Sequence, residues 1–264
     1  MAKTIVCTAL DPVSRLVRDS LISTLELSHE GRIGKYRSFE GGNIRLVDIE
    51  CNHIDAAMLD AEVPSELFVF PSVHASVQGI ISFTTHPEGN WGPRADLGGK
   101  PYSISVAAPI SMLSVLHSLS QNTPGPGVSY EATHHGPLLD TPSLFVEIGG
   151  APDSVNGEYT KVVAKAIAEL VLSDEQPEFD RIAVGIGSGH YPARFTALAL
   201  EGKFAFSHIM SKYYTDNINM LEAAFSRSKP KAEVAVVEWK SIKSEERKEI
   251  IGRLDEIGID YVKI

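Results

Sequence analysis

Short apolar runs alternate with amphipathic helical patterns along most of this chain, and this alternation restricts the folds that it can adopt. We expect strands at residues 4–9, 44–49, 67–70, 80–85, 128–133, 144–148, 181–186, 234–239 and 259–264. We expect helices at residues 11–27, 110–120, 157–172, 215–225 and 244–257, and one more from residue 194. Thr215 or Asp216 is expected to cap the fourth of these helices, and Ser244 the fifth. Strands that alternate with helices indicate an α/β fold, here a three-layer sandwich with a mixed sheet.

The length of the chain allows one substantial hydrophobic core. We interpret residues 1–264 as a single α/β catalytic domain. Residues 87–102 are rich in Gly and Pro and follow neither a helical nor a strand period. A loop of this length inside a compact domain is usually functional, so we expect it to contribute to a site.

Charge and composition exclude several classes of partner. The formal net charge is −10, whereas wrapping a long nucleic acid needs several Lys or Arg contacts to phosphate, so we expect no DNA partner. Acidic and basic side chains are equal in number in residues 201–264, where the basic ones are either solvated helix faces or a small nucleic-acid footprint. No apolar run approaches the ~20 residues that span a bilayer, and the first residues lack a signal-peptide pattern. We therefore expect a cytoplasmic monomer without a membrane partner.

Five of the nine histidines lie at the ends of expected strands or in the loops beside them: His74, His86, His134, His135 and His190. In open α/β sheets, ligand sites form beyond the carboxyl ends of the strands. Separate strands would therefore bring these imidazoles to one rim of the sheet. Imidazole is a good zinc ligand, and the carboxylates of Glu131 and Glu147 are candidates to complete the coordination.

The segment Glu131–Pro137 is the most informative part of the chain. Neighbouring residues of a strand point to opposite faces, so His134 and His135 reach one metal ion only if the chain turns, and Gly136-Pro137 supplies a turn. The alternative is a polar strand end whose histidines have ordinary hydrogen-bond partners, because no His-x-x-x-His spacing marks a metal site here.

The loop Gly185-Ile186-Gly187-Ser188-Gly189-His190 follows an expected strand. It departs from the dinucleotide fingerprint, because His190 stands where a glycine or alanine is needed. Its backbone N–H groups from Gly187 to Gly189 are candidates to bind a phosphate or a developing oxyanion. The alternative is that these glycines only permit a tight turn. Cys7 and Cys51 have no Cys-x-x-Cys partner, and His29, His53, His117 and His208 are expected to be surface or core residues.

These motifs together resemble a known family. The sequence Glu131-Ala132-Thr133-His134-His135-Gly136-Pro137, the sequence Phe145-Val146-Glu147-Ile148-Gly149 and the sequence Gly189-His190-Tyr191-x-x-Arg194-Phe195-Thr196 carry the resemblance. The motifs His74-x-Ser76 before Gly79-Ile80, Thr85-His86-Pro87-x-Gly89-Asn90 and Gly98-Gly99 support it. In this order they resemble the zinc-dependent D-aminoacyl-tRNA deacylases of archaea and plants.

The resemblance implies a phosphorylase/peptidyl-tRNA-hydrolase-like fold, one or two Zn²⁺ ions, and hydrolysis of the ester that joins a D-amino acid to the tRNA 3′ end. The expected catalytic residues are His134, His135, His190 and Glu131. The expected metal ligands come from His74, His86, His134, His135, Glu147 and His190. Substrate contacts are expected from Gly187, Gly189, Tyr191 and Asn90.

Two other functions are compatible with the same residues. One is a metal-dependent amidohydrolase or peptidase that acts on a small acyl substrate. The other is a non-catalytic tRNA-binding protein whose histidines are structural. A zinc ion lowers the pKa of a bound water to about 7, so ester hydrolysis at neutral pH is chemically coherent with the histidine-rich segments.

Overall fold

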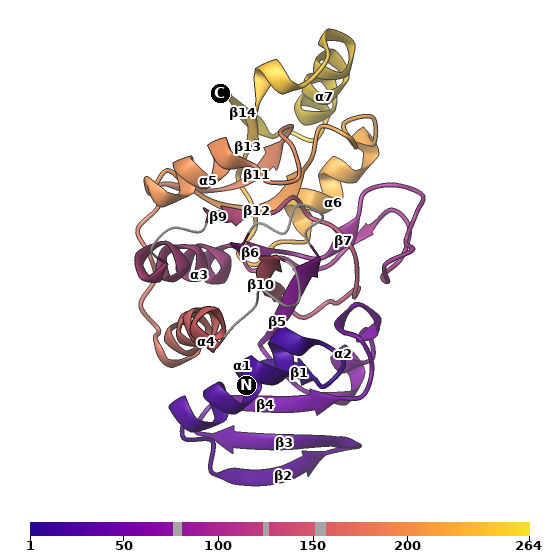
Figure 1. The fold of residues 1–264 in the computed structure, drawn as a ribbon. Coiled ribbons are helices and arrows are strands. Elements are labelled where there is room, and N and C mark those ends of the chain that lie inside the picture. Colours follow the sequence, from indigo (N-terminus) through magenta and orange to yellow (C-terminus); the bar gives the residue numbers. More distant parts are fainter. Residues whose placement is uncertain (76–80, 124–126, 151–156) are drawn as a thin grey trace.

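The computed structural model describes residues 1–75, 81–123, 127–150 and 157–264. Among these residues, eight strands form one mixed sheet in the order β2-β3-β4-β1-β5-β10-β6-β9 (Figure 1). The strands are β1 (Lys3–Thr8), β2 (His29–Ile33), β3 (Tyr36–Gly41), β4 (Ile44–Ile49), β5 (Leu67–Ala75), β6 (Ser82–His86), β9 (Gly127–Tyr130) and β10 (Ser143–Gly150). β10 runs parallel to β5 and antiparallel to β6. The prediction of an α/β fold with a mixed sheet is confirmed.

A second sheet contains the strands of the C-terminal part of the chain. It is parallel, with the order β12-β11-β13-β14. Its strands are β11 (Arg181–Ile186), β12 (Phe204–Met210), β13 (Val234–Val237) and β14 (Asp260–Lys263). The sequence did not predict this division into two sheets. Buried side chains of both sheets belong to one apolar cluster, and the single-domain organisation stays a prediction.

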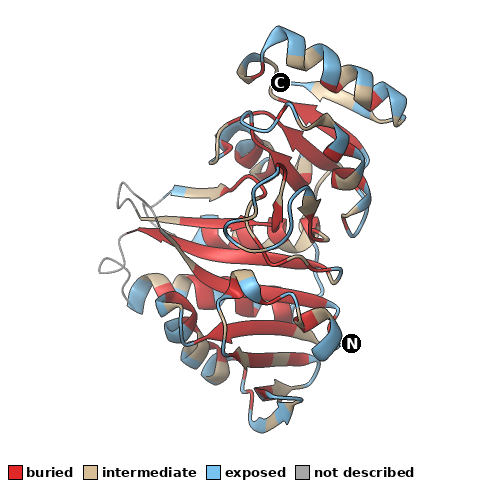
Figure 2. Ribbon diagram, turned by 90° about the vertical axis from the view of Figure 1, so that its right-hand side faces the viewer, coloured by how far each residue is buried: buried red, intermediate tan, exposed pale blue. Residues whose placement is uncertain are grey.

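Helices cover the sheets. They are α1 (Pro12–Thr24), α2 (Leu59–Glu62), α3 (Pro109–Asn122), α4 (Gly157–Leu172), α5 (Ala193–Leu200), α6 (Leu221–Ser226) and α7 (Ser244–Glu256). The apolar residues of α1, α3 and α4 pack on one face of the large sheet. Leu59 and Val63, at α2, pack with the phenylalanines of the other face. Most strand residues are buried between these layers, whereas α7 shows a largely exposed surface (Figure 2).

Local signals explain where several elements begin. Asp11 caps α1, because its carboxylate accepts a hydrogen bond of 2.8 Å from the Ser14 N–H, and Pro12 follows at the first helical position. The expected cap at Ser244 is wrong: Lys243 is the N-cap and its side chain makes no capping bond. Thr215 is no cap either, because its hydroxyl contacts the Lys212 carbonyl and the Glu246 carboxylate.

Some expected elements change length or are replaced. The helix expected at residues 215–225 is a 3₁₀ turn at Ile218–Met220 followed by α6. The expected loop 87–102 contains β7 (Gly89–Asn90), which pairs with β8 (Ser103–Ile104). Strand β2, strand β3 and strand β12 were not predicted. The start of the strand expected at 80–85 lies outside the described residues, as do Ser76, Gly79 and Ile80.

The strand expected at 128–133 ends early, at Tyr130. The Glu131 N–H still bonds to the Thr85 carbonyl of the large sheet, at 3.1 Å. The next two N–H groups bond to the small sheet and its loop, Ala132 to the His190 carbonyl at 2.9 Å and Thr133 to the Ile209 carbonyl at 3.0 Å. Residues 131–135 therefore cross from one sheet to the other, and the site lies at this crossing.

Candidate metal centre and active site

Glu147 lies in the middle of β10, and its two neighbouring strands each place a histidine near it. In the sheet register, His74 of β5 is opposite Gly149, and His86 of β6 is opposite Phe145. Positions 145, 147 and 149 of β10 lie on the same face, because side chains alternate along a strand. Paired residues of neighbouring strands project to the same side, so His74, His86 and Glu147 share this face. One carboxylate oxygen of Glu147 lies 3.3 Å from His74 Nδ1 and 3.5 Å from His86 Nε2.

This register corrects the expectation that the histidines meet at one rim. Because β6 runs against β5 and β10, its carboxyl end lies near the amino-terminal half of β10. His86 and His74 thus approach Glu147 from opposite directions, over the face of the sheet. The antiparallel pairing of β6 with β10 is the feature that the sequence did not indicate.

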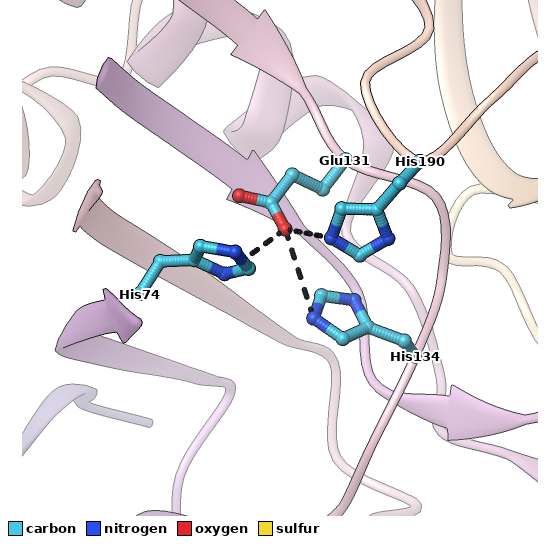
Figure 3. Close-up of side chains that lie close together, drawn as sticks. All are labelled: His74, Glu131, His134 and His190. Atoms are coloured by element: carbon cyan, nitrogen blue, oxygen red, sulfur yellow. Dashed lines mark ion pairs between the residues drawn. The ribbon is translucent and has the colours of Figure 1, made fainter. Parts of the chain in front are cut away.

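Glu131 is the second carboxylate of the site, and three histidines surround it (Figure 3). Its Oε2 atom lies 2.7 Å from His190 Nε2, 3.3 Å from His74 Nδ1 and 3.6 Å from His134 Nε2. His190 reaches it from the loop after β11, and His134 from the crossing segment. The carboxylate itself is fully buried.

Three histidines are oriented by their own backbone. Nδ1–H of His86 donates to the Pro87 carbonyl at 3.1 Å, and Nδ1–H of His134 donates to the Ala132 carbonyl at 2.9 Å. Nδ1–H of His135 donates to the Gly136 carbonyl at 2.6 Å. A carbonyl oxygen only accepts, so each ring has a hydrogen on Nδ1. Nε2 then presents a lone pair in any of the three rings that is neutral, and His86 needs to lose its second proton before it can bind a metal ion through this atom. This is the arrangement of metal-ligating histidines.

The turn after His134 allows two neighbouring histidines to converge. His135 adopts φ of 44°, in the left-handed region that residues other than glycine rarely occupy. Its ring centroid lies 4.4 Å from that of His134 and 4.9 Å from that of His86. Gly136 is required next, because a Cβ there would lie 2.3 Å from the Gly99 amide nitrogen of the 87–102 loop.

Burial and the two carboxylates set the protonation of the histidines. Burial lowers the pKa of His135 to about 4 and that of His134 well below its usual value, so both rings are neutral at pH 7. Burial also acts on His86, but the nearby Glu147 carboxylate outweighs it and the pKa rises to about 9. Burial alone would raise the pKa of Glu147, yet the neighbouring His74 and His86 rings hold it well below the usual range. This carboxylate attracts positive charge.

Several buried polar atoms of the site lack a hydrogen-bond partner among the described residues. They are both carboxylate oxygens of Glu131, Oε2 of Glu147, Nε2 of His86 and Nε2 of His190. Nε2 of His190 comes within 2.7 Å of Glu131 without satisfying hydrogen-bond geometry. Unpaired buried polar groups are costly, and an ion held between them would remove that cost.

Three sets of donor atoms have the composition of a metal site. They are His74, Glu131, His134 and His190; then His86, His134 and His135; and then His86, Glu131 and Glu147. Within each set the donor atoms lie within 4.8 Å of one another. Imidazole nitrogen and carboxylate oxygen are donors that suit zinc. The residues present therefore fit a divalent ion.

A cavity of about 560 Å³ opens beside this cluster. Its wall includes His134, His135 and His190, together with residues 89–94 of the long loop and Tyr213 and Tyr214 after β12. Residues of the 87–102 loop thus line the cavity, and the functional role of this loop stays a prediction. The cavity gives a bound molecule access to the histidines.

The expected substrate-binding residues have different surroundings. Asn90 lines the cavity, but its amide donates to the Gly98 carbonyl at 2.9 Å and so holds the loop. Tyr191 is exposed beside the cluster, its ring centroid 5.0 Å from that of His190. The Gly187 N–H donates to the Met210 carbonyl and the Ser188 N–H to Ser241 Oγ, both at 2.9 Å. These two amides are therefore not available to an oxyanion, and that expectation is wrong for them.

Sequence reasoning missed other residues at the site. Glu88 is fully buried behind the cluster; burial raises its pKa to about 7, and the Ser143 hydroxyl donates to it at 2.8 Å. Tyr213 and Tyr214 line the cavity but follow a strand that was not predicted. Two adjacent tyrosines directly after the apolar run at 204–210 were the available signal.

A buried cluster of imidazoles and carboxylates beside an open cavity defines the class of this molecule as a candidate metal-dependent enzyme. The sequence model of the family described as D-aminoacyl-tRNA deacylase matches residues 61–262, which include every histidine and carboxylate of the cluster. Of the chain, 99% aligns with 99% of the D-aminoacyl-tRNA deacylase of Pyrococcus furiosus at 35% identity. The chain thus belongs to the D-aminoacyl-tRNA deacylase family.

Two further comparisons agree. The D-aminoacyl-tRNA deacylase of Methanosarcina mazei is 35% identical, over 98% of this chain and 91% of that protein. A crystal structure of a conserved protein of unknown function has a TM-score of 0.90 and 28% identity, and covers 99% of this chain and 95% of its own. The fold described above is therefore found in a solved structure.

Proposed function

We propose that this protein hydrolyses the ester bond between a D-amino acid and the 3′ end of a tRNA, releasing the free amino acid and the tRNA. One observation carries the proposal. The family match spans residues 61–262, and the histidines and carboxylates within this range form a buried cluster beside a cavity. Because such a substrate belongs to translation, we also propose that the protein acts in the cytoplasm.

We infer that His86, His134 and His135 hold a divalent metal ion, zinc being the candidate. One donor atom from each ring lies within 4.8 Å of the other two, and the Nδ1–H groups are all bound to backbone carbonyls, which leaves Nε2 for the ion. Glu147 lies beside His86 and supplies negative charge. Such an ion supplies Lewis acidity, which polarises a carbonyl and lowers the pKa of water to about 7. The second set, around Glu131, then takes either a second ion or a proton-transfer role, and a measured stoichiometry of one metal ion per chain would favour the latter.

Glu131 and His190 are suited to move protons. The Glu131 oxygen faces the cavity-lining histidines and accepts a proton from the attacking water. His190 Nε2, 2.7 Å from that oxygen, passes the proton to the ribose oxygen that leaves. The water oxygen becomes part of the amino acid carboxyl group, and the tRNA regains its hydroxyl.

The cavity accommodates the substrate's end rather than its body. An exposed single-stranded 3′ end can be held by ring stacking and a few polar contacts. This is compatible with a chain whose formal net charge is −10, because few phosphates need to be neutralised.

The test compares matched D- and L-aminoacyl-tRNA as substrates for the wild type, His134→Ala and His135→Ala. We expect the wild type to hydrolyse the D-ester much faster than the L-ester, and both variants to lose this activity while remaining folded. Retained deacylation in both folded variants contradicts the proposed site. Hydrolysis of an amide analogue at a rate comparable to the D-ester would instead favour an amidohydrolase.

A further inference from the structure

Two exposed tyrosines line the cavity beside the cluster. Tyr213 is 70% exposed and Tyr214 is 41% exposed, and the two are neighbours in the sequence. The same cavity contains His134 and His190 in its wall. A molecule bound in this cavity can therefore contact both the histidines and the tyrosines.

The two rings differ in how they are held. The Tyr214 ring packs against the long loop: a Cβ at Gly92 would lie 3.3 Å from the ring. Tyr214 thus bridges the 87–102 loop and the segment after β12, and forms part of a fixed wall. The Tyr213 ring has Lys212 Nζ at 5.4 Å from its centroid and leaves most of its surface to solvent.

Positive charge accompanies these rings. Lys212 is exposed next to Tyr213. Arg94, on the part of the cavity wall formed by the long loop, is also exposed and is oriented by Asp96, whose carboxylate accepts from Arg94 Nε at 2.6 Å. An aromatic face with flanking cations is the combination that binds single-stranded nucleic acid, through base stacking and phosphate contacts.

We propose that Tyr213 is a stacking platform for a base of the single-stranded RNA 3′ end, and that Lys212 and Arg94 contact its phosphates. The inference rests on the proposed function for the identity of the ligand, and it adds the residues that grip it outside the catalytic cluster. Tyr213 acts in binding, so its loss raises KM and leaves kcat near its wild-type value.

The test measures binding of the RNA tetranucleotide ACCA, without an attached amino acid and with a 5′ fluorophore, by fluorescence anisotropy. We expect Tyr213→Ala to weaken binding about 10-fold, as expected from losing one stacked base, and Tyr213→Phe to restore it because stacking uses the ring. The matched control is Tyr102→Ala: Tyr102 is 51% exposed in the same loop region but does not line the cavity, so this variant should bind like the wild type.

A second arm varies the salt concentration. Lys212→Gln should reduce the slope of log Kd against log salt by about 0.7, the value for one phosphate contact to a single strand. Equal binding by the wild type and Tyr213→Ala, or equal losses in Tyr213→Ala and Tyr102→Ala, would overturn the inference. If Tyr213→Ala loses ACCA binding but the wild type hydrolyses no D-aminoacyl-tRNA, the binding site stands and the proposed function fails.

Discussion

Buried histidines lie both outside and inside the candidate site of this molecule, and the two environments differ in the partners of the ring nitrogens. His208 is completely buried, but Thr133 Oγ1 lies 3.1 Å from its Nδ1 and the Arg227 carbonyl 2.9 Å from its Nε2. His53 is also buried and bonds through Nε2 to the Val6 carbonyl at 3.1 Å. Among the described residues neither makes an ion pair. In the cluster, by contrast, Nε2 of His86 and of His190 has no hydrogen-bond partner in the described part of the chain, and carboxylates face the rings.

Burial alone therefore does not identify a functional histidine. Burial lowers the pKa of His208 to about 4, much as it lowers that of His135, so the two are electrostatically similar. They differ because both nitrogens of His208 have partners within the protein, whereas His135, bonded to the backbone through Nδ1, belongs to a set of candidate metal donors. Substitutions in the cluster should therefore affect activity, whereas a substitution of His208 should affect stability.

The largest effect is expected from Glu131→Gln. The amide keeps the size of the side chain but removes the proton acceptor and the charge between three histidines. We expect kcat for D-aminoacyl-tRNA to fall by roughly 10²–10⁴-fold, the usual contribution of a general base. Single-turnover rates measure it, and a fall smaller than about 10-fold would exclude this role for Glu131.

A smaller effect is expected from Glu147→Gln. This carboxylate contacts His74 and His86 and raises the pKa of both. Its loss should reduce metal affinity and activity by about 10–100-fold, as removal of supporting groups around metal ligands does. Metal titration of the chelated protein and the deacylation rate measure the two effects, and wild-type metal affinity would place the ion away from Glu147.

In the other region, His208→Gln should reduce stability rather than activity. The amide of Gln reproduces only part of the two hydrogen bonds, so we expect a loss of about 1–2 kcal/mol in the free energy of unfolding. kcat for D-aminoacyl-tRNA should stay close to that of the wild type. Urea denaturation and the deacylation assay are the measurements, and a large loss of kcat without loss of stability would contradict the division between the regions.

The same residue predicts a pH dependence of stability. The pKa of His208 is about 4 in the folded protein and 6.5 when unperturbed, so the unfolded chain binds the proton more tightly. The stability that the neutral ring contributes is present above pH 6.5 and is lost as the pH falls toward 4. This loss is on the order of 3 kcal/mol, and His208→Gln should lack it. Urea denaturation of chelated protein at several pH values measures the difference; parallel curves would show that His208 does not titrate in this way.

The sequence predicted the fold where hydrophobic pattern and turn residues act locally. Strand β4, strand β11 and helix α4 have the expected bounds. Strand β2 was not predicted because its residues are mostly exposed at the sheet edge and form no apolar run. β12 was missed because Ser207 and His208 interrupt the apolar residues of Phe204–Met210, and its pairing with β11 in a second sheet is not a local property.

The candidate site was predictable in its residues and not in its geometry. The sequence places the histidines at or beside the ends of expected strands and the carboxylates within them. The antiparallel pairing that brings His86 to Glu147 is, however, a long-range property. Likewise, the crossing segment at 131–135 leaves the strand because its N–H groups find carbonyls of the small sheet. The amide of Gly187 was assigned to substrate wrongly for the same reason: its partner, Met210, is remote in sequence.

We propose that the histidine–carboxylate cluster holds a metal ion and that this centre hydrolyses D-aminoacyl-tRNA. The most direct measurement follows bound zinc and D-aminoacyl-tRNA deacylation in the same samples of wild type, first chelated and then titrated with zinc. We predict that activity disappears on chelation and returns in proportion to zinc until one ion per chain is bound. Full activity in protein that contains no stoichiometric metal and is unaffected by chelator would contradict the claim.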